Sequence, residues 1–223
     1  MTSRCKLFVT LCAVALCSAT TAIAGDVRYG SNGKLHKASM PVPALADKPT
    51  ATLAGGDFMR RADTTSFWTL EDIIVETVTA GQVPDALRHF RKITFTTPVV
   101  DSVEILRKKH KVEMWVLPDY VAIGTNDDFV RMPMGPLAAQ RIADALDCTL
   151  PTPFLVDRIA EASEGHVDIF PFRPLGNRNS QPIVFQDSNN AINAQFKAYG
   201  YEFGQFISGL KKDIVLTYKI MTL

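Results

Sequence analysis

Residues 111–136 have the sequence KVEMWVLPDYVAIGTNDDFVRMPMGP, and the rest of the chain is arranged around this stretch. Its first part, VEMWV, alternates apolar and polar residues. This predicts a β-strand, because successive side chains of a strand point to opposite faces. Tyr120 to Gly124 and Phe129 to Met132 show two further short strand patterns, and the TNDD turn between them predicts a β-hairpin. The stretch therefore forms the expected centre of an antiparallel sheet.

Five more segments are predicted or candidate strands. The sequence KITFTT at 92–97 is β-branched and aromatic, which is typical of a strand. Residues 99–106 fit either a strand or a helix. We favour a strand that forms a hairpin with 112–116, because the polar residues Arg107 to His110 would connect the two. The remaining strand patterns lie at 166–170, 183–185 and 213–221.

Helical periodicity predicts five helices around these strands. The first begins near Ser66 and ends at Gly81, because glycine commonly terminates a helix. Thr152 is a predicted N-cap, and Pro153 suits the first turn of the helix that follows. The other predicted helices span residues 84–90, 137–146 and 187–199.

These elements predict an α+β fold in one domain, residues 57–223. A mostly antiparallel sheet would contain residues 92–132, 166–170 and 213–221. Two helical pairs, 66–90 and 137–162, would cover one face of that sheet. A chain of this size can bury enough apolar surface to be stable without disulfides.

The N-terminal 24 residues predict a secretory signal peptide. Arg4 and Lys6 precede an apolar run that ends in small residues at Ala22 and Ala24, so we expect cleavage after Ala24. The alternative is an uncleaved membrane anchor, which the near-minimal length and the Ser/Thr-rich second half disfavour. Residues 25–56 are rich in Pro, Ala, Gly and Lys, which predicts a flexible leader. We expect a secreted protein with no membrane span after cleavage.

Composition and motifs disfavour several functions. The formal net charge is +1, so the chain has no basic field for nucleic acid and we expect no such partner. Phosphate-binding loops, dinucleotide fingerprints and G-x-S-x-G are missing from the sequence, so kinase, dehydrogenase and serine-hydrolase interpretations have no support.

Cleavage would leave Cys148 as the only thiol, because the other three cysteines lie in the signal at positions 5, 12 and 17. A nucleophilic Cys148 would need its pKa lowered by a helix N-terminus or a neighbouring histidine. The alternative is a small buried apolar residue beside Leu146 and Leu150.

His166 and Asp168 are the other candidates for chemistry. Two residues apart on a strand, they would share one face and could act as a base with its orienting acid, or as two metal ligands. The alternative is a solvated pair on an exposed strand. A metal needs a third ligand, and the acids near the 111–136 turns lack a calcium-loop register, so turn chemistry explains them better. We expect no metal and no cofactor.

Three segments carry a resemblance: AGQVPDALRHF at 80–90, LPDYVAIGTNDDFVRMPMGPLAAQRIADALDCTLPTPFLVD at 117–157 and GLKKDIVLTYKI at 209–220. Together they resemble a group of larger secreted microbial proteins with no established activity. Members of that group continue into a further segment with histidines and aromatics, and a histidine stands where this chain has Leu210. The resemblance thus implies that this chain lacks a C-terminal segment of its relatives, and it carries no catalytic role over.

Two functions remain open at this point. The first is a non-enzymatic extracellular binding or effector-like protein, whose partner is a protein or a wall polymer and whose contact surface includes the loop 173–181. The second is a secreted hydrolase acting on a wall or extracellular polymer, with Cys148 as nucleophile, His166 as base and Asp168 as its orienting acid.

Overall fold

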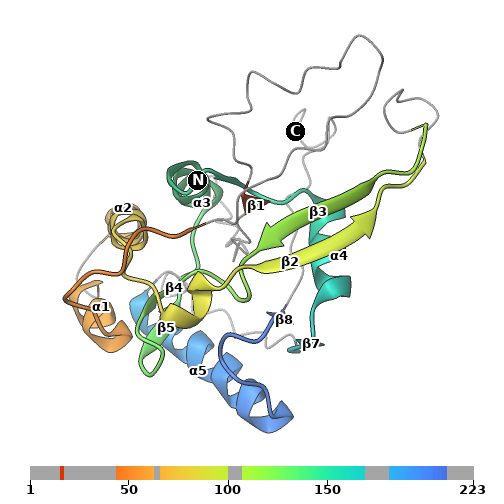
Figure 1. The fold of residues 1–223 in the computed structure, drawn as a ribbon. Coiled ribbons are helices and arrows are strands. Elements are labelled where there is room, and N and C mark those ends of the chain that lie inside the picture. The colour runs from red at the N-terminus through yellow and green to blue at the C-terminus, as the bar shows by residue number, and fades with distance from the viewer. Residues whose placement is uncertain (1–15, 18–43, 63–65, 100–106, 169–180, 210–223) are drawn as a thin grey trace, which may run out of the picture.

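The computed structural model describes residues 16–17, 44–62, 66–99, 107–168 and 181–209. It confirms the α+β class, with helices arranged around short, mostly antiparallel strand pairs (Figure 1). The predicted strand 213–221, most of 99–106 and the loop 173–181 except Gln181 lie outside the described residues. No helix in the described ranges is both long and apolar enough to cross a bilayer.

The helices follow the predicted periodicity closely. Ser66 caps α2 by accepting a hydrogen bond from Thr69 N at 3.3 Å, and Thr152 caps α4 by accepting one from Leu155 N at 3.4 Å. The residues 84–90 contain a 3₁₀ turn, η1, in place of the predicted helix. The bounds are α1 Gly55–Ala62, α2 Phe67–Thr79, η1 Asp85–Arg88, α3 Pro136–Ala145, α4 Pro153–Ala162 and α5 Pro182–Tyr199.

The strands form separate two-stranded pairs in the described residues, where a single sheet was expected. Pro118 lies two residues after the end of β3 and has no N–H for a ladder, so the sheet does not continue from β3 into β4. Three pairs are antiparallel and one is parallel. They are β2 (Arg91–Thr96) with β3 (Lys111–Val116), β4 (Ala122–Gly124) with β5 (Phe129–Arg131), β1 (Leu16–Cys17) with β6 (Cys148–Thr149), and, in parallel, β7 (Gly165–His166) with β8 (Ile207–Ser208).

Two local predictions are corrected. The partner of β3 is β2, so the hairpin joins 91–96 to 111–116 and does not start from 99–106. Residues 183–185 belong to α5 and not to a strand. Ile183 is exposed whereas Val184 and Phe185 are buried, and Pro182 fills the first helical turn, where its missing N–H costs nothing. The predicted hairpin across the TNDD turn is confirmed as β4–β5.

Within the described residues, the core has two parts. The larger cluster lies between α1, α2, α3 and the β4–β5 hairpin, with side chains such as Phe58, Ile74, Ile123, Val130 and Ile142. The smaller cluster joins the inner face of the β2–β3 hairpin to α4 and β8, and it contains Ile93, Met114, Val116, Ile159 and Phe206. The hairpin extends from the body of the molecule along α4 (Figure 1).

Residues 44–56 contact the domain that follows them. Residues 44–56 were assigned to the flexible leader, but Leu45 and Leu53 pack against the larger core cluster. Leu53 N also donates to Gln82 Oε1 at 2.7 Å, and Arg88 donates to the Ala46 carbonyl at 2.6 Å. The strand β1 lies within the predicted signal peptide and pairs with β6. Cleavage after Ala24 would therefore remove this partner from β6.

Candidate functional site

Asn126 and Asp128 of the TNDD turn have structural partners, as turn chemistry predicts. The Asp128 carboxylate accepts from Gly56 N at 3.1 and 3.2 Å, which satisfies a backbone donor in the first turn of α1. Asn126 Oδ1 accepts from Ala86 N at 3.0 Å and so joins the turn to η1. These contacts connect the β4–β5 turn to two neighbouring elements.

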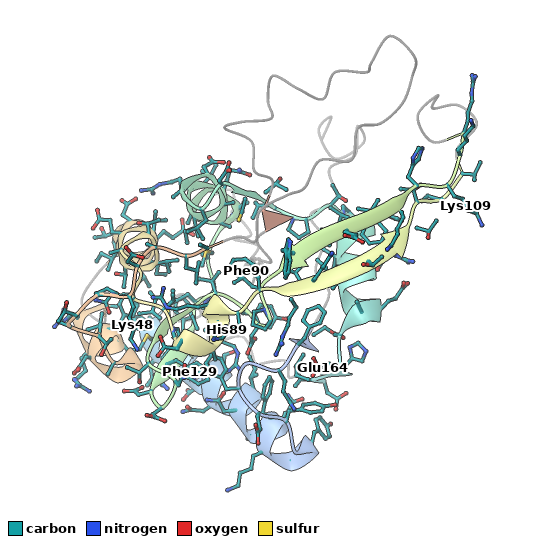
Figure 2. The ribbon with its side chains drawn as sticks, in the orientation of Figure 1. Lys48, His89, Phe90, Lys109, Phe129 and Glu164 are labelled. Carbon is teal, nitrogen blue, oxygen red and sulfur yellow. The ribbon has the colours of Figure 1, made fainter. Side chains whose placement is uncertain are left out.

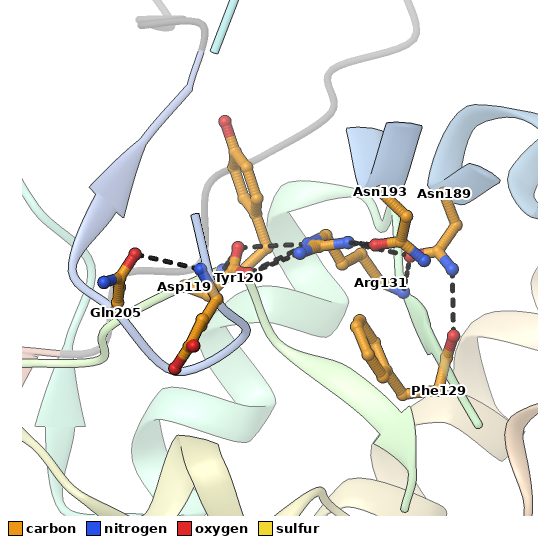
Figure 3. A network of polar contacts seen from close by, with 8 residues as sticks. Asp119, Tyr120, Phe129, Arg131, Asn189, Asn193 and Gln205 are labelled. Atoms are coloured by element: carbon orange, nitrogen blue, oxygen red, sulfur yellow. Dashed lines mark hydrogen bonds and ion pairs between the residues drawn. The ribbon is translucent and has the colours of Figure 1, made fainter. Parts of the chain in front are cut away.

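Arg131 is the centre of a buried polar network (Figure 3). Its side chain is 5% exposed and that of Asp119 is 2% exposed. Arg131 Nη2 donates to Asp119 Oδ2 at 2.7 Å, and Nε lies 3.1 and 3.0 Å from the two carboxylate oxygens. A planar guanidinium fits a carboxylate in this two-pronged geometry. The charge of each group is therefore compensated inside the protein.

The same guanidinium connects the hairpin to α5. Arg131 Nη1 donates to Asn189 Oδ1 at 3.1 Å and to Asn193 Oδ1 at 2.7 Å, both on α5. Asn189 also accepts from the Arg131 backbone N at 3.1 Å and donates to the Phe129 carbonyl at 2.9 Å (Figure 3). The side-chain amide of Asn189 on α5 thus hydrogen-bonds to the backbone of β5 on the edge that is not paired with β4.

Three aromatic rings surround this cation. The Arg131 guanidinium carbon lies 5.0 Å from the centroids of Phe129 and Phe196 and 5.6 Å from that of Phe203. The Phe129 and Phe203 rings stack with centroids 3.7 Å apart. Such contacts favour a cation that has lost its water. Because every guanidinium nitrogen already has a protein acceptor, the network serves the structure and offers little to a ligand.

Cys148 lies in the larger core cluster and is 7% exposed. It follows α3, and its Sγ donates to the Leu146 carbonyl at 3.2 Å. This placement agrees with the alternative of a small buried residue beside Leu146 and Leu150, of which Leu150 packs against the same cluster.

His166 is exposed at the end of β7, where β7 and β8 place it directly opposite Ser208. Its Nδ1 is hydrogen-bonded to Ser208 Oγ. The ladder continues on both sides, from Glu164 N to the Phe206 carbonyl at 2.7 Å and from Val167 N to the Ser208 carbonyl at 3.0 Å. The parallel pair therefore fixes the imidazole against the hydroxyl.

Ser208 also accepts a hydrogen bond from Ser163. Ser163 Oγ lies 2.7 Å from the Ala160 carbonyl oxygen and 3.0 Å from Ser208 Oγ. Ser163 Oγ is the donor in both contacts, so its single proton is shared between the Ala160 carbonyl and Ser208 Oγ. The direction of the hydrogen bond between His166 Nδ1 and Ser208 Oγ depends on the tautomer of the imidazole. With either tautomer the contact uses Nδ1 only, and Nε2 is left to face a partner.

Asp168 contacts α5 and not His166. Its backbone N donates to Gln195 Oε1 at 2.7 Å, and its Oδ2 accepts a hydrogen bond from the Tyr199 hydroxyl. This hydrogen bond to the carboxylate, together with its negative charge, raises the pKa of Tyr199 above the ordinary value. The Tyr199 ring lies beside Tyr201, with centroids 5.8 Å apart.

The structure separates the predicted site residues. Cys148 precedes α4 and His166 follows it, and a helix of ten residues is about 15 Å long. Figure 1 shows α4 extending from the region of β1, the partner of β6, to β7 at its other end. His166 and Asp168 are both exposed, but they hydrogen-bond to different elements, β8 and α5. No group of three or more His, Cys, Asp or Glu side chains in the described ranges could hold a metal ion.

Sequence reasoning missed the partners Ser208, Ser163 and Tyr199. Ser208 is 42 residues from His166 and Tyr199 is 31 residues from Asp168, so no spacing in the sequence indicates these pairs. The one local signal is Gly165, next to His166. A Cβ there would lie 2.6 Å from Tyr201 Cζ, so only glycine allows the ring to pack against this strand.

Comparisons with protein-family models, with curated proteins and with solved structures gave no match to this chain.

Proposed function

We propose that the protein is secreted, as a relative of the secreted microbial group that it resembles, and that it binds an extracellular protein or wall polymer without catalysing a reaction. The observation that carries this proposal is a patch that we call the polar face. It is formed by the end of α4, the β7–β8 pair and the end of α5, and its residues are Ser163, His166, Asp168, Tyr199, Tyr201 and Ser208.

The polar face has the chemistry of a binding surface. Tyrosine, serine, histidine and aspartate combine apolar contact area with hydrogen-bonding groups, and such residues are common where one protein recognises another molecule. Tyr199 is 49% exposed. Within the described residues, His166 Nε2 and Asp168 Oδ1 have no hydrogen-bond partner. A partner can use these two atoms without displacing an existing contact.

The side chains of the polar face are also fixed before a partner arrives. Ser208 orients the His166 ring, and Asp168 orients the Tyr199 ring. A side chain that is already ordered loses less entropy on binding, so more of the contact energy appears as affinity. The loop 173–181, the contact surface that the sequence predicts, remains a prediction.

The experiment is a capture assay with the purified protein and two fractions, the cell wall and the culture medium of the source organism. We expect wild-type protein to retain a partner and the double variant His166→Ala/Tyr199→Ala to lose it. The control is Gln140→Ala/Asp144→Ala, which removes an exposed contact on α3, far from the polar face (Figure 1). Equal retention by both variants, or no retained partner in either fraction, would refute the proposal.

The hydrolase remains a second candidate, since His166 touches one hydroxyl nucleophile, Ser208. Two labelling reactions separate it from the binding function. If the protein only binds, a fluorophosphonate leaves Ser208 unmodified, and iodoacetamide modifies Cys148 quickly only after denaturation. Rapid modification of either residue in the folded protein would favour the hydrolase. Mass spectrometry of the secreted chain tests cleavage after Ala24 in the same samples.

A further inference from the structure

The far end of the β2–β3 hairpin carries a run of basic residues. The sequence RKKHK occupies 107–111, and Figure 2 shows Lys109 at the end of the hairpin that is farthest from the body of the molecule. The hairpin is ordered up to this point. Thr97 N donates to the His110 carbonyl at 2.9 Å, and His110 N donates to Thr97 Oγ1 at 3.0 Å. We call residues 107–111 the basic tip.

The charge of the basic tip is only partly compensated. Lys111 lies 3.0 Å from Glu113, which also pairs with Lys92 at 2.6 Å. Lys92, which has the larger effect, and Lys111 lower the pKa of Glu113 to about 2, so Glu113 stays charged in ordinary buffers. Lys108 and Lys109 are exposed, and no carboxylate within the described ranges pairs with them.

The surplus of positive charge is local to this end of the hairpin. The protein as a whole has a formal net charge of +1. The hairpin connection from 97 to 111 contains four lysines and arginines and two acids, Asp101 and Glu104, which gives a net charge of +2 in fifteen residues. Because exposed charges act over about 10 Å at moderate ionic strength, this end of the molecule attracts anions although the whole protein is nearly neutral.

We propose that the basic tip binds a linear anionic polysaccharide. The charge requires an anionic partner, and the proposed extracellular location makes a polymer of acidic sugars a better fit than nucleic acid. A membrane fits less well, because RKKHK contains no large apolar side chain that could enter the lipid. Phe, Tyr and Trp, on which the bases of single-stranded nucleic acids stack, are also missing from these five residues. The inference rests on the proposed secretion but not on the polar face.

The experiment measures binding of the mature protein to immobilised polygalacturonate, with neutral dextran as the blank. We expect binding that weakens as salt is added. The variant Lys108→Ala/Lys109→Ala should bind about fivefold to tenfold more weakly, because two exposed charge contacts are lost. The matched control is Arg61→Ala/Lys197→Ala, which removes the same charge from two exposed residues on α1 and α5. The control should bind as the wild type does.

Three results would overturn the proposal: unchanged binding by the tip variant, an equal loss in the control, or tighter binding to phosphatidylglycerol vesicles or single-stranded DNA than to polygalacturonate. The polar-face variant His166→Ala/Tyr199→Ala keeps the two proposals distinguishable. If it alone loses polygalacturonate binding, the tip proposal fails and the polar face stands. If only the tip variant loses it, the basic tip is confirmed whatever the capture assay shows. Circular dichroism checks that each variant is folded.

Discussion

Two short strand pairs of this protein, β4–β5 and β7–β8, use polar side chains in opposite ways. At β4–β5, Arg131 on β5 and Asp119 just before β4 are buried, and their guanidinium and carboxylate groups are hydrogen-bonded to protein atoms. On β7–β8, His166 is exposed, and its contact with Ser208 uses only one ring nitrogen. The difference teaches where to look for function. A polar group whose partners all lie inside the protein fixes the structure, whereas an oriented group with an open atom can contact a partner.

The largest expected effect comes from breaking the buried pair. Arg131→Met leaves the Asp119 carboxylate buried without its counter-ion, so we expect the free energy of unfolding to fall by about 3–5 kcal/mol. Urea denaturation followed by circular dichroism measures this change. The matched control is Arg141→Ala, whose partner Asp72 lies 2.6 Å away with both side chains more than half exposed. That variant should lose at most about 1 kcal/mol.

If Arg131→Met does not fold, the double variant Arg131→Met/Asp119→Leu keeps the prediction testable. It removes the uncompensated charge together with its partner, so it should be more stable than Arg131→Met. Equal losses in Arg131→Met and Arg141→Ala would contradict the difference drawn between buried and exposed pairs.

A smaller effect is expected at the contact between the hairpin and α5. Asn189→Ala leaves the Arg131 backbone N and the Phe129 carbonyl without their side-chain partner, at a site that is 2% exposed. An unsatisfied buried group costs about 1–3 kcal/mol, and the same denaturation experiment measures it. Asn190→Ala, one position along the helix and exposed, should change stability by no more than about 0.5 kcal/mol. A larger loss in Asn190→Ala would show that the network is not what joins α5 to the hairpin.

The smallest effect concerns the polar face. Asp168→Asn removes the negative charge beside Tyr199, so the pKa of Tyr199 should fall back toward its ordinary value near 10. The raised pKa favours the folded state below pH 10, and this contribution disappears as the pH rises through the folded pKa. Absorbance at 295 nm follows the titration, and Tyr199→Phe identifies its share. A titration unchanged by Asp168→Asn would mean that the contact does not persist in solution.

Local patterns predicted much of the fold. The Thr152–Pro153 helix start and the TNDD hairpin depend on contacts between near neighbours, and both are confirmed. The strand prediction for residues 183–185 was wrong. It followed from the β-branched and aromatic residues there, whereas Pro182 and the burial of Val184 and Phe185 favour a helix. Packing decided between two patterns that the sequence allows.

The candidate site was less predictable from sequence. His166 and Asp168 were expected to share one face of a strand, but β7 ends at His166, and the partners Ser208 and Tyr199 come from segments far along the chain. A parallel pair such as β7–β8 needs a long connection between its strands, so no turn motif in the sequence indicates the pair. The sequence also left undecided whether Cys148 is buried, because its burial depends on packing among α3, β6 and the larger core cluster.

Native-state hydrogen exchange tests the contrast between the two strand pairs most directly. The amide of Arg131, bonded to Asn189, and that of Met132, bonded to the Val121 carbonyl, should exchange only when the whole protein unfolds. The amides of Glu164 and Val167 in the β7–β8 ladder should exchange at least about tenfold faster, through local opening near the surface. Equal exchange in both pairs, or slower exchange in β7–β8, would contradict the assignment of β4–β5 to the scaffold and of β7–β8 to the polar face.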